Sequence, residues 1–67
     1  MAELANRLRE LRAEHGLTQA ALAEAVGVTR KTINTVENGV FVPSTTLALK
    51  LAAALGCPVE AIFSLKP

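Results

Sequence analysis

The sequence has little of several residue types on which particular protein classes depend. Among its 67 residues are one cysteine, two phenylalanines and no tryptophan or tyrosine. The single cysteine, Cys57, excludes a disulfide within the chain and a cysteine-rich metal cluster, and it fits a reducing compartment. Because aromatic residues make up 3% of the sequence and hydrophobic residues 51%, we expect a core of leucine, valine, isoleucine and alanine.

A strong net charge and a long apolar run are also absent. Seven lysines and arginines oppose six acidic residues, for a net charge of +1, so the total charge neither requires nor excludes a polyanionic partner. The N-terminal region carries charges at Glu3, Arg7, Arg9 and Glu10, where a signal peptide would have an apolar core. No apolar run approaches the length of a membrane span. These features predict a cytoplasmic protein with no membrane partner.

The sequence also lacks the groups that catalysis needs. It shows no metal-ligand cluster, no nucleophile paired with a base and no phosphate-binding glycine-rich loop, so we expect neither an enzyme nor a cofactor or metal site. His15 falls at the end of an expected helix, where the helix dipole favours it. Cys57 is expected to act as a small, half-buried hydrophobic residue.

The sequence does contain apolar residues at helical spacing, in a chain long enough for one domain. Leu4, Leu8, Leu11 and His15 share one face of an expected first helix that ends at Gly16. Few β-branched runs and no alternation of apolar with polar residues argue against a sheet. We therefore predict an all-α fold of five helices, with residues 1–67 forming one domain.

Capping residues mark the next two helices. Thr18 is expected to cap a second helix that ends at Gly27, and Thr29 a third helix that runs to about Asn38. The buried sides of these two helices are expected to hold Leu22, Ala23, Val26, Ile33 and Val36.

Proline and glycine divide the rest of the chain. Pro43 disfavours helix in the residue before it, so a loop is expected before a fourth helix that begins at Ser44 or Thr45 and ends at Gly56. A short fifth helix, with a proline in its first turn, is then expected to run through Phe63.

The second and third helices have the geometry of a helix-turn-helix. They are joined by a short turn that includes Gly27, and the stretch from Ala25 to Val36 contains no acid. A helix-turn-helix delivers its second helix into the major groove of DNA, with the N-terminal end suited to phosphate. There Arg30 could pair with guanine, Lys31 with phosphate and Asn34 with adenine. The sequence does not decide which of these contacts are made.

The pattern from Leu17 to Gly39 reads L-T-Q-x-x-L-A-x-x-x-G-V-T-x-x-x-I-x-x-x-E-N-G. It resembles the signature of the lambda-repressor-like, or Xre-type, helix-turn-helix regulators. Segments 30–34, 43–44, 47–52 and 56–63 are similar to a subgroup of small stand-alone bacterial regulators, so the resemblance covers nearly the whole chain. It implies the five-helix lambda-repressor-like fold and a function in binding double-stranded DNA to regulate transcription.

The resemblance also implies roles for individual residues. The family residue that matches Gln19 contacts the DNA backbone, and the one that matches Asn38 donates to a phosphate. Thr18 and Thr29 are caps first and phosphate ligands second. The family often has lysine or arginine where this chain has Val40–Val42, so fewer phosphate contacts are expected. The full set of expected DNA-binding residues is Thr18, Gln19, Thr29, Arg30, Lys31, Thr32, Asn34, Thr35 and Asn38.

Two further residues have a structural role by the same resemblance. In relatives, the residues that match Arg12 and Glu37 form a partly buried ion pair between the first helix and the end of the third. We therefore expect this ion pair to support the fold rather than any chemistry.

Several apolar residues are left over once the core is assigned. Phe41, Leu49, Phe63 and Leu65 have no obvious place in it, and spare apolar surface on a small chain usually marks an interface. We predict a homodimer on a palindromic operator, with two recognition helices about one DNA turn apart. The tail from Phe63 to Lys66 is expected to pair as a short strand with its symmetry mate. The predicted dimer contacts are Leu49, Ile62, Phe63 and Leu65.

These observations favour a sequence-specific repressor that acts as a homodimer, and the repressor role rests on the family and on the lack of an activation domain. Two alternatives stay open. An antitoxin would use the spare apolar surface to bind a toxin, and a neighbouring toxin gene would identify it. A protein-interaction module that has lost DNA binding would explain the near-neutral charge and the apolar loop Val40–Val42, and salt-dependent binding to DNA of mixed sequence would separate it from a regulator.

Overall fold

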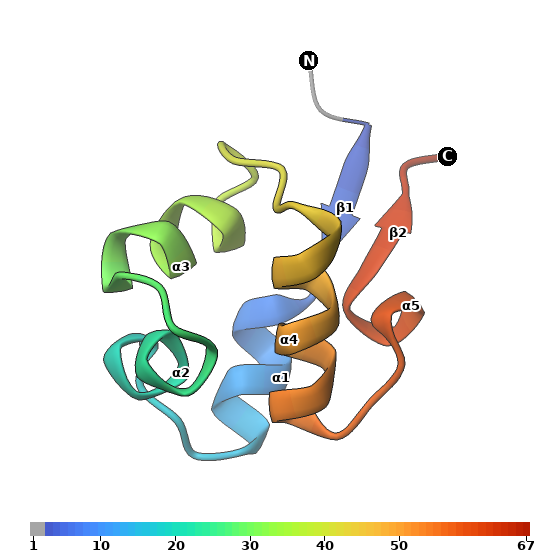
Figure 1. Ribbon diagram of the computed structural model, residues 1–67. Coiled ribbons are helices and arrows are strands. Elements are labelled where there is room, and N and C mark those ends of the chain that lie inside the picture. The colour runs from blue at the N-terminus through green and yellow to red at the C-terminus, as the bar shows by residue number, and fades with distance from the viewer. Residues whose placement is uncertain (1–2) are drawn as a thin grey trace.

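The computed structural model describes residues 3–67, which form five helices and two short strands. Helix α4 runs through the middle of the molecule, with α2 and α3 on one side and the two strands on the other (Figure 1). Within these residues no helix combines the length and the apolar character needed to span a membrane. The mostly helical architecture confirms the predicted fold class. The elements are β1 Leu4–Asn6, α1 Leu8–Glu14, α2 Gln19–Val26, α3 Arg30–Glu37, α4 Thr45–Leu55, α5 Val59–Ile62 and β2 Phe63–Leu65.

Side-chain caps begin α2, α3 and α4. The hydroxyls of Thr18, Thr29 and Ser44 accept hydrogen bonds from backbone N–H groups in the first turns, at 3.0, 3.3 and 3.1 Å. Each such cap contributes about 1 kcal/mol to stability. Gly27 and Gly56 end α2 and α4 with φ of 76° and 64°, a left-handed conformation that glycine adopts without strain. Local sequence signals thus set the ends of the helices around the candidate site.

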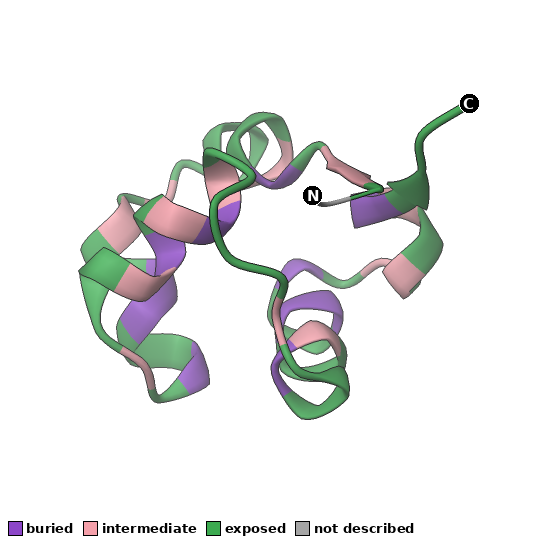
Figure 2. Cartoon of the chain, turned by 90° about the horizontal axis from the view of Figure 1, so that it is seen from above, coloured by how far each residue is buried: buried purple, intermediate pink, exposed green. Residues whose placement is uncertain are grey.

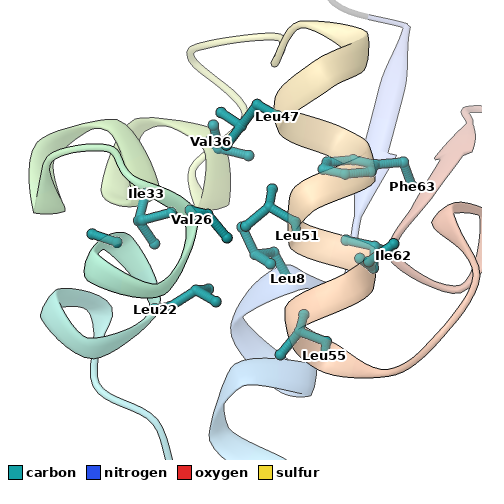
Figure 3. Close-up of a cluster of buried hydrophobic side chains, with 12 residues drawn as sticks. Leu8, Leu22, Val26, Ile33, Val36, Leu47, Leu51, Leu55, Ile62 and Phe63 are labelled. Carbon is teal, nitrogen blue, oxygen red and sulfur yellow. The ribbon is translucent and has the colours of Figure 1, made fainter.

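One hydrophobic core joins the five helices and β2. Leu8, Leu22, Ile33 and Leu51 have no exposed surface, and Figure 3 shows their side chains gathered between the helices. Burying a side chain of this size contributes about 1.5–3 kcal/mol, so the core is the main source of stability. The other buried residues are Ala23, Val26, Val36, Leu47, Ala52, Leu55, Ile62 and Phe63.

The two strands form an antiparallel sheet that the sequence did not predict. Leu4 lies opposite Leu65, and Asn6 lies opposite Phe63. The expectation of no sheet is therefore wrong, as are the placement of Leu4 in the first helix and of Phe63 in the fifth. Each strand has three residues, too few to show an alternating pattern, and the partners lie at opposite ends of the sequence.

Asn6 links the sheet to α1 and α3. Its Oδ1 accepts a hydrogen bond from the Leu8 N–H at 3.1 Å, which begins α1, and its Nδ2 donates to the Val36 carbonyl at 3.0 Å. Val36 lies in the last turn of α3. The end of α3 is therefore tied to the sheet.

Ile62 and Phe63 belong to the core of a single chain, with 2% and 7% of their surface exposed. The expectation that Phe63 has nothing to cover within one subunit is wrong, because its ring packs beside α4 (Figure 3). Figure 2 shows that β2 starts buried and continues exposed. Within the chain β2 pairs with β1, so one edge of this tail is already occupied, and its pairing with a symmetry mate stays a prediction.

Candidate nucleic-acid interface

Helices α2 and α3 form a helix-turn-helix whose second helix is exposed along its outer side. They pack against each other and are joined by a short turn (Figure 1). Helix α3 buries Ile33 and Val36, which lie three residues apart and so share one side. It leaves Arg30, Lys31 and Asn34 exposed. The outer side of α3 therefore displays two cations and an amide on a rigid helix.

The exposed end of α3 and the start of α2 line an open hollow. Its residues are Gln19, Thr29, Arg30, Lys31 and Asn34, and none of them is acidic. The positive end of the α3 dipole lies at the same place. Predicted DNA-binding residues from two helices thus meet at one surface that carries two cations and no acid.

Three amide side chains on this surface are bonded to one another. Gln19 Nε2 donates to Asn34 Oδ1 at 3.2 Å and to Glu37 Oε1 at 3.0 Å. Asn38 Nδ2 donates to the same Asn34 Oδ1 at 3.3 Å. The amides are therefore held in one orientation before any ligand arrives, which lowers the entropy lost on binding.

Glu37, in the last turn of α3, is the centre of this network. Its side chain has no exposed surface, and its Oε2 accepts a hydrogen bond from Arg12 Nε at 2.6 Å. Arg12 also donates from Nη2 to Glu37 Oε1 at 3.3 Å and from Nη1 to the Leu17 carbonyl at 2.9 Å. The structure thus places the two residues that the resemblance pairs in direct contact, and Arg12 ties α1 to both halves of the helix-turn-helix.

The charge of Glu37 is stabilised in spite of its burial. Desolvation by burial would raise the pKa of Glu37, whereas hydrogen bonds from Arg12, Gln19 and Arg9 and the positive charge of Arg12 lower it. The lowering contributions win, and the pKa lies below its usual value. Glu37 is therefore ionised at neutral pH, and its charge is balanced by arginines rather than presented to a polyanion.

Arg9 is a member of this network that sequence reasoning missed. Its Nη2 donates to Asn38 Oδ1 at 2.9 Å, and its Nε donates to Glu37 Oε1 at 3.4 Å. Arg9 precedes Arg12 by three residues and so shares its side of α1, and this spacing was the available signal. Because the Arg9 side chain is 61% exposed, its guanidinium extends the positive surface beyond α3.

The predicted threonines bond mainly within the protein. Besides the caps at Thr18 and Thr29, the hydroxyls of Thr29 and Thr32 lie 3.1 Å apart. The Thr35 hydroxyl donates to the Thr32 carbonyl at 2.9 Å. Because their hydroxyls are bonded within the protein, these side chains contribute mainly methyl groups to the outer side of α3 and few free hydroxyl donors.

The predicted dimer residues fall into two groups. Leu49 and Leu65 are 57% and 78% exposed, whereas Ile62 and Phe63 are buried by their own chain and cannot supply contact surface. The prediction for these two buried residues is wrong for that reason. Beside Leu49 lies an apolar hollow of about 350 Å³. It is lined by Leu4, Val42, Pro43, Thr45, Ala48, Leu49, Val59 and Phe63.

One comparison bears on the antitoxin alternative. Antitoxin HigA-1 of Vibrio cholerae is 54% identical to this chain over 41 residues, which cover 61% of this chain and 38% of that protein. The similarity is therefore confined to part of each protein.

Other comparisons cover most of the chain. The helix-turn-helix family model matches residues 8–62. The HTH-type transcriptional regulator YgzD of Bacillus subtilis is 46% identical over 61 residues, which cover 91% of this chain and 92% of that protein. The restriction-modification controller protein C.AhdI of Aeromonas hydrophila is 42% identical with a TM-score of 0.78, covering 82% of this chain and 83% of that one. The P22 c2 repressor, solved with synthetic operator 9T, is 33% identical with a TM-score of 0.78, covering 81% and 82%. This chain belongs to the helix-turn-helix family of DNA-binding transcriptional regulators.

Proposed function

We propose that this regulator is a sequence-specific repressor that binds a palindromic operator as a homodimer in the cytoplasm. Helix α3 enters the major groove, and occupancy of the operator blocks transcription. The observation that carries the proposal is the outer side of α3, where Arg30 and Lys31 stand beside amides that are already oriented by the buried Glu37 network. The similarity to a repressor solved with an operator supports it.

The side chains divide between reading bases and holding phosphates. Arg30 is matched to the acceptor edge of guanine and Asn34 to the edge of adenine, and a good bidentate pair discriminates by about 1–3 kcal/mol. Lys31 carries a compact positive charge that binds phosphate, so it adds affinity without sequence information. Gln19 and Asn38 flank Asn34 in the hydrogen-bond network. Asn38 Nδ2 keeps one hydrogen that suits a DNA phosphate, whereas both Nε2 hydrogens of Gln19 are already donated within the protein, so Gln19 contacts the backbone only by giving up one of these bonds.

The exposed apolar residues support a dimer. Leu49 and Leu65 lie on α4 and β2, and β2 lies across α4 from α3 (Figure 1). Two copies that meet there leave both α3 helices free for DNA. A two-fold axis then sets the helices about one DNA turn apart, which matches the two half-sites of a palindrome.

The test measures binding to the promoter of the protein's own gene over a range of salt concentrations. We expect Lys31→Ala to weaken binding to all duplexes and to reduce the salt slope by about 1, and Arg30→Ala mainly to erase the preference for the operator over other sequences. Lys50→Ala is the matched control, because Lys50 is an exposed cation on α4. If Arg30→Ala and Lys31→Ala bind the promoter as the unmutated protein does, α3 is not the recognition helix. Absence of salt-dependent binding to any duplex would instead favour the protein-interaction module.

A further inference from the structure

The loop after α3 forms a second, apolar hollow on the outer side of that helix. Its volume is about 360 Å³, and Val40 and Phe41 in its wall are 78% and 46% exposed. The contacts proposed above, from cations and amides to guanine, adenine or phosphate, give these exposed apolar residues no role. We call it the Phe41 hollow, and its lining residues are Lys31, Thr32, Thr35, Val40 and Phe41.

The loop is fixed to the helix by its backbone. The N–H groups of Val40 and Phe41 both donate to the Thr35 carbonyl, at 2.9 and 3.2 Å. Gly39, with φ of 74°, supplies the left-handed residue that turns the chain back toward α3. The Phe41 hollow is therefore formed before DNA binds and needs no ordering of the loop.

The chemistry of the Phe41 hollow suits a small apolar group beside an anion. The Thr35 hydroxyl is bonded to the Thr32 carbonyl, and the Thr32 hydroxyl lies against that of Thr29, so the surface is mostly apolar. Lys31 belongs both to this hollow and to the one lined by Arg30 and Gln19. The Lys31 side chain thus lies between the Phe41 hollow and the polar hollow at the start of α3.

We propose that the Phe41 hollow receives the C5-methyl group of a thymine and so selects thymine at one position of each half-site. That methyl is the apolar group that base edges present in the major groove, and a neighbouring phosphate would meet Lys31. The proposal rests on the proposed function, because it requires α3 to lie in the major groove. It gives the apolar loop Val40–Val42 a role in recognition where cations would have bound phosphate.

The experiment first selects bound duplexes from a randomised library with the unmutated protein. Fluorescence anisotropy then compares the selected duplex with copies in which single thymines are replaced by deoxyuridine, which removes the methyl alone. We expect one thymine in each half-site whose replacement weakens binding about fourfold, the effect of one buried methyl group. Phe41→Ala should bind the thymine and uracil duplexes equally. Phe41→Leu and Val42→Ala are the controls and should keep the difference, and circular dichroism verifies that each variant is folded.

The outcomes separate the two proposals. Selection of a specific duplex that is bound equally with thymine or uracil at every position would overturn the methyl site and leave the proposed function intact. A thymine preference that survives in Phe41→Ala would also overturn it. Replacing the selected thymine–adenine pair by 5-methylcytosine–guanine should weaken binding, and tighter binding would assign the hollow to methylated cytosine instead. If no duplex is bound at all, both proposals fail together.

Discussion

The two sides of α4 are stabilised differently. On the α3 side, a buried carboxylate, Glu37, collects hydrogen bonds from Arg12, Arg9 and Gln19. On the sheet side, the side chains of Ile62 and Phe63 are buried in the hydrophobic core, and the hydrogen bonds near them come mainly from the backbone. Polar contacts fix directions, which suits the surface that we propose presents donors to DNA. Apolar burial supplies more free energy but little direction, which suits a side whose task is to hold the fold together.

The largest effect is expected on the sheet side, from Phe63→Ala. Removing a buried phenylalanine side chain costs about 3–5 kcal/mol, a large part of the stability of a small domain. Urea unfolding followed by circular dichroism should show a marginally folded protein. Leu65→Ala is the matched control two residues along the same strand, and because Leu65 is exposed its effect should stay within about 0.5 kcal/mol. Equal effects of the two variants would show that Phe63 is not part of the core.

On the α3 side, Arg12→Ala or Glu37→Ala is expected to destabilise the fold by about 3 kcal/mol, because the first removes the shortest ion pair of the buried Glu37 carboxylate and the second leaves Arg12 without its acidic partner. A double-mutant cycle should show coupling between them. If the two effects add within about 0.5 kcal/mol, the ion pair does not contribute to stability. The exposed pair Arg7–Glu10, at 3.3 Å, is the control. Its coupling should not exceed about 0.5 kcal/mol.

Acid should weaken the α3 side selectively. The pKa of Glu37 is lowered in the folded protein, so its contribution is complete above the usual glutamate pKa of about 4.3 and is lost as the pH falls through the lower folded value. We therefore measure the free energy of unfolding between neutral pH and about pH 3. In the acid range it should fall less steeply for Glu37→Gln than for the unmutated protein. Glu60→Gln, an exposed residue on α5, should keep the original slope. Parallel curves for all three proteins would exclude Glu37 as the titrating group.

The smallest effect on folding is expected from the exposed apolar residues. Leu49→Ser with Leu65→Ser should change the free energy of unfolding by less than about 1 kcal/mol, because surface substitutions are usually within about 0.5 kcal/mol each. Sedimentation should nevertheless show a monomer, and binding to a palindromic operator should weaken because each half-site is then occupied independently. A dimer that persists in the double variant would place the contact elsewhere.

The sequence predicted those parts of the fold that short-range signals specify. Thr18, Thr29 and Ser44 cap helices where expected, because a cap bonds within its own first turn. The sheet was missed because its two strands are short and far apart in the sequence. Phe63 was assigned to an interface for the same reason, since its neighbours in the core come from distant elements that no local pattern reveals.

The candidate site shows the same division. Arg30, Lys31 and Asn34 lie on the exposed side of α3, which helical periodicity alone predicts. The bonds that orient Asn34 come from Gln19 in another helix and from Asn38, and the contact of Arg9 with Asn38 joins residues from α1 and the end of α3. The Asn34–Asn38 bond joins residues four apart and follows from helical spacing, whereas the contacts of Gln19 and Arg9 depend on the packing of whole helices, so spacing within one helix does not predict them.

The pairing of β1 with β2 also has a consequence for the order of folding. Every contact between these strands closes a loop of nearly the whole chain, and such contacts form late because loop closure must be offset by other structure first. During synthesis the residues of β2 leave the ribosome after the helices that surround α4. The nascent chain can therefore assemble α1 to α4 around Leu51, but it cannot complete its core until Phe63 has been translated.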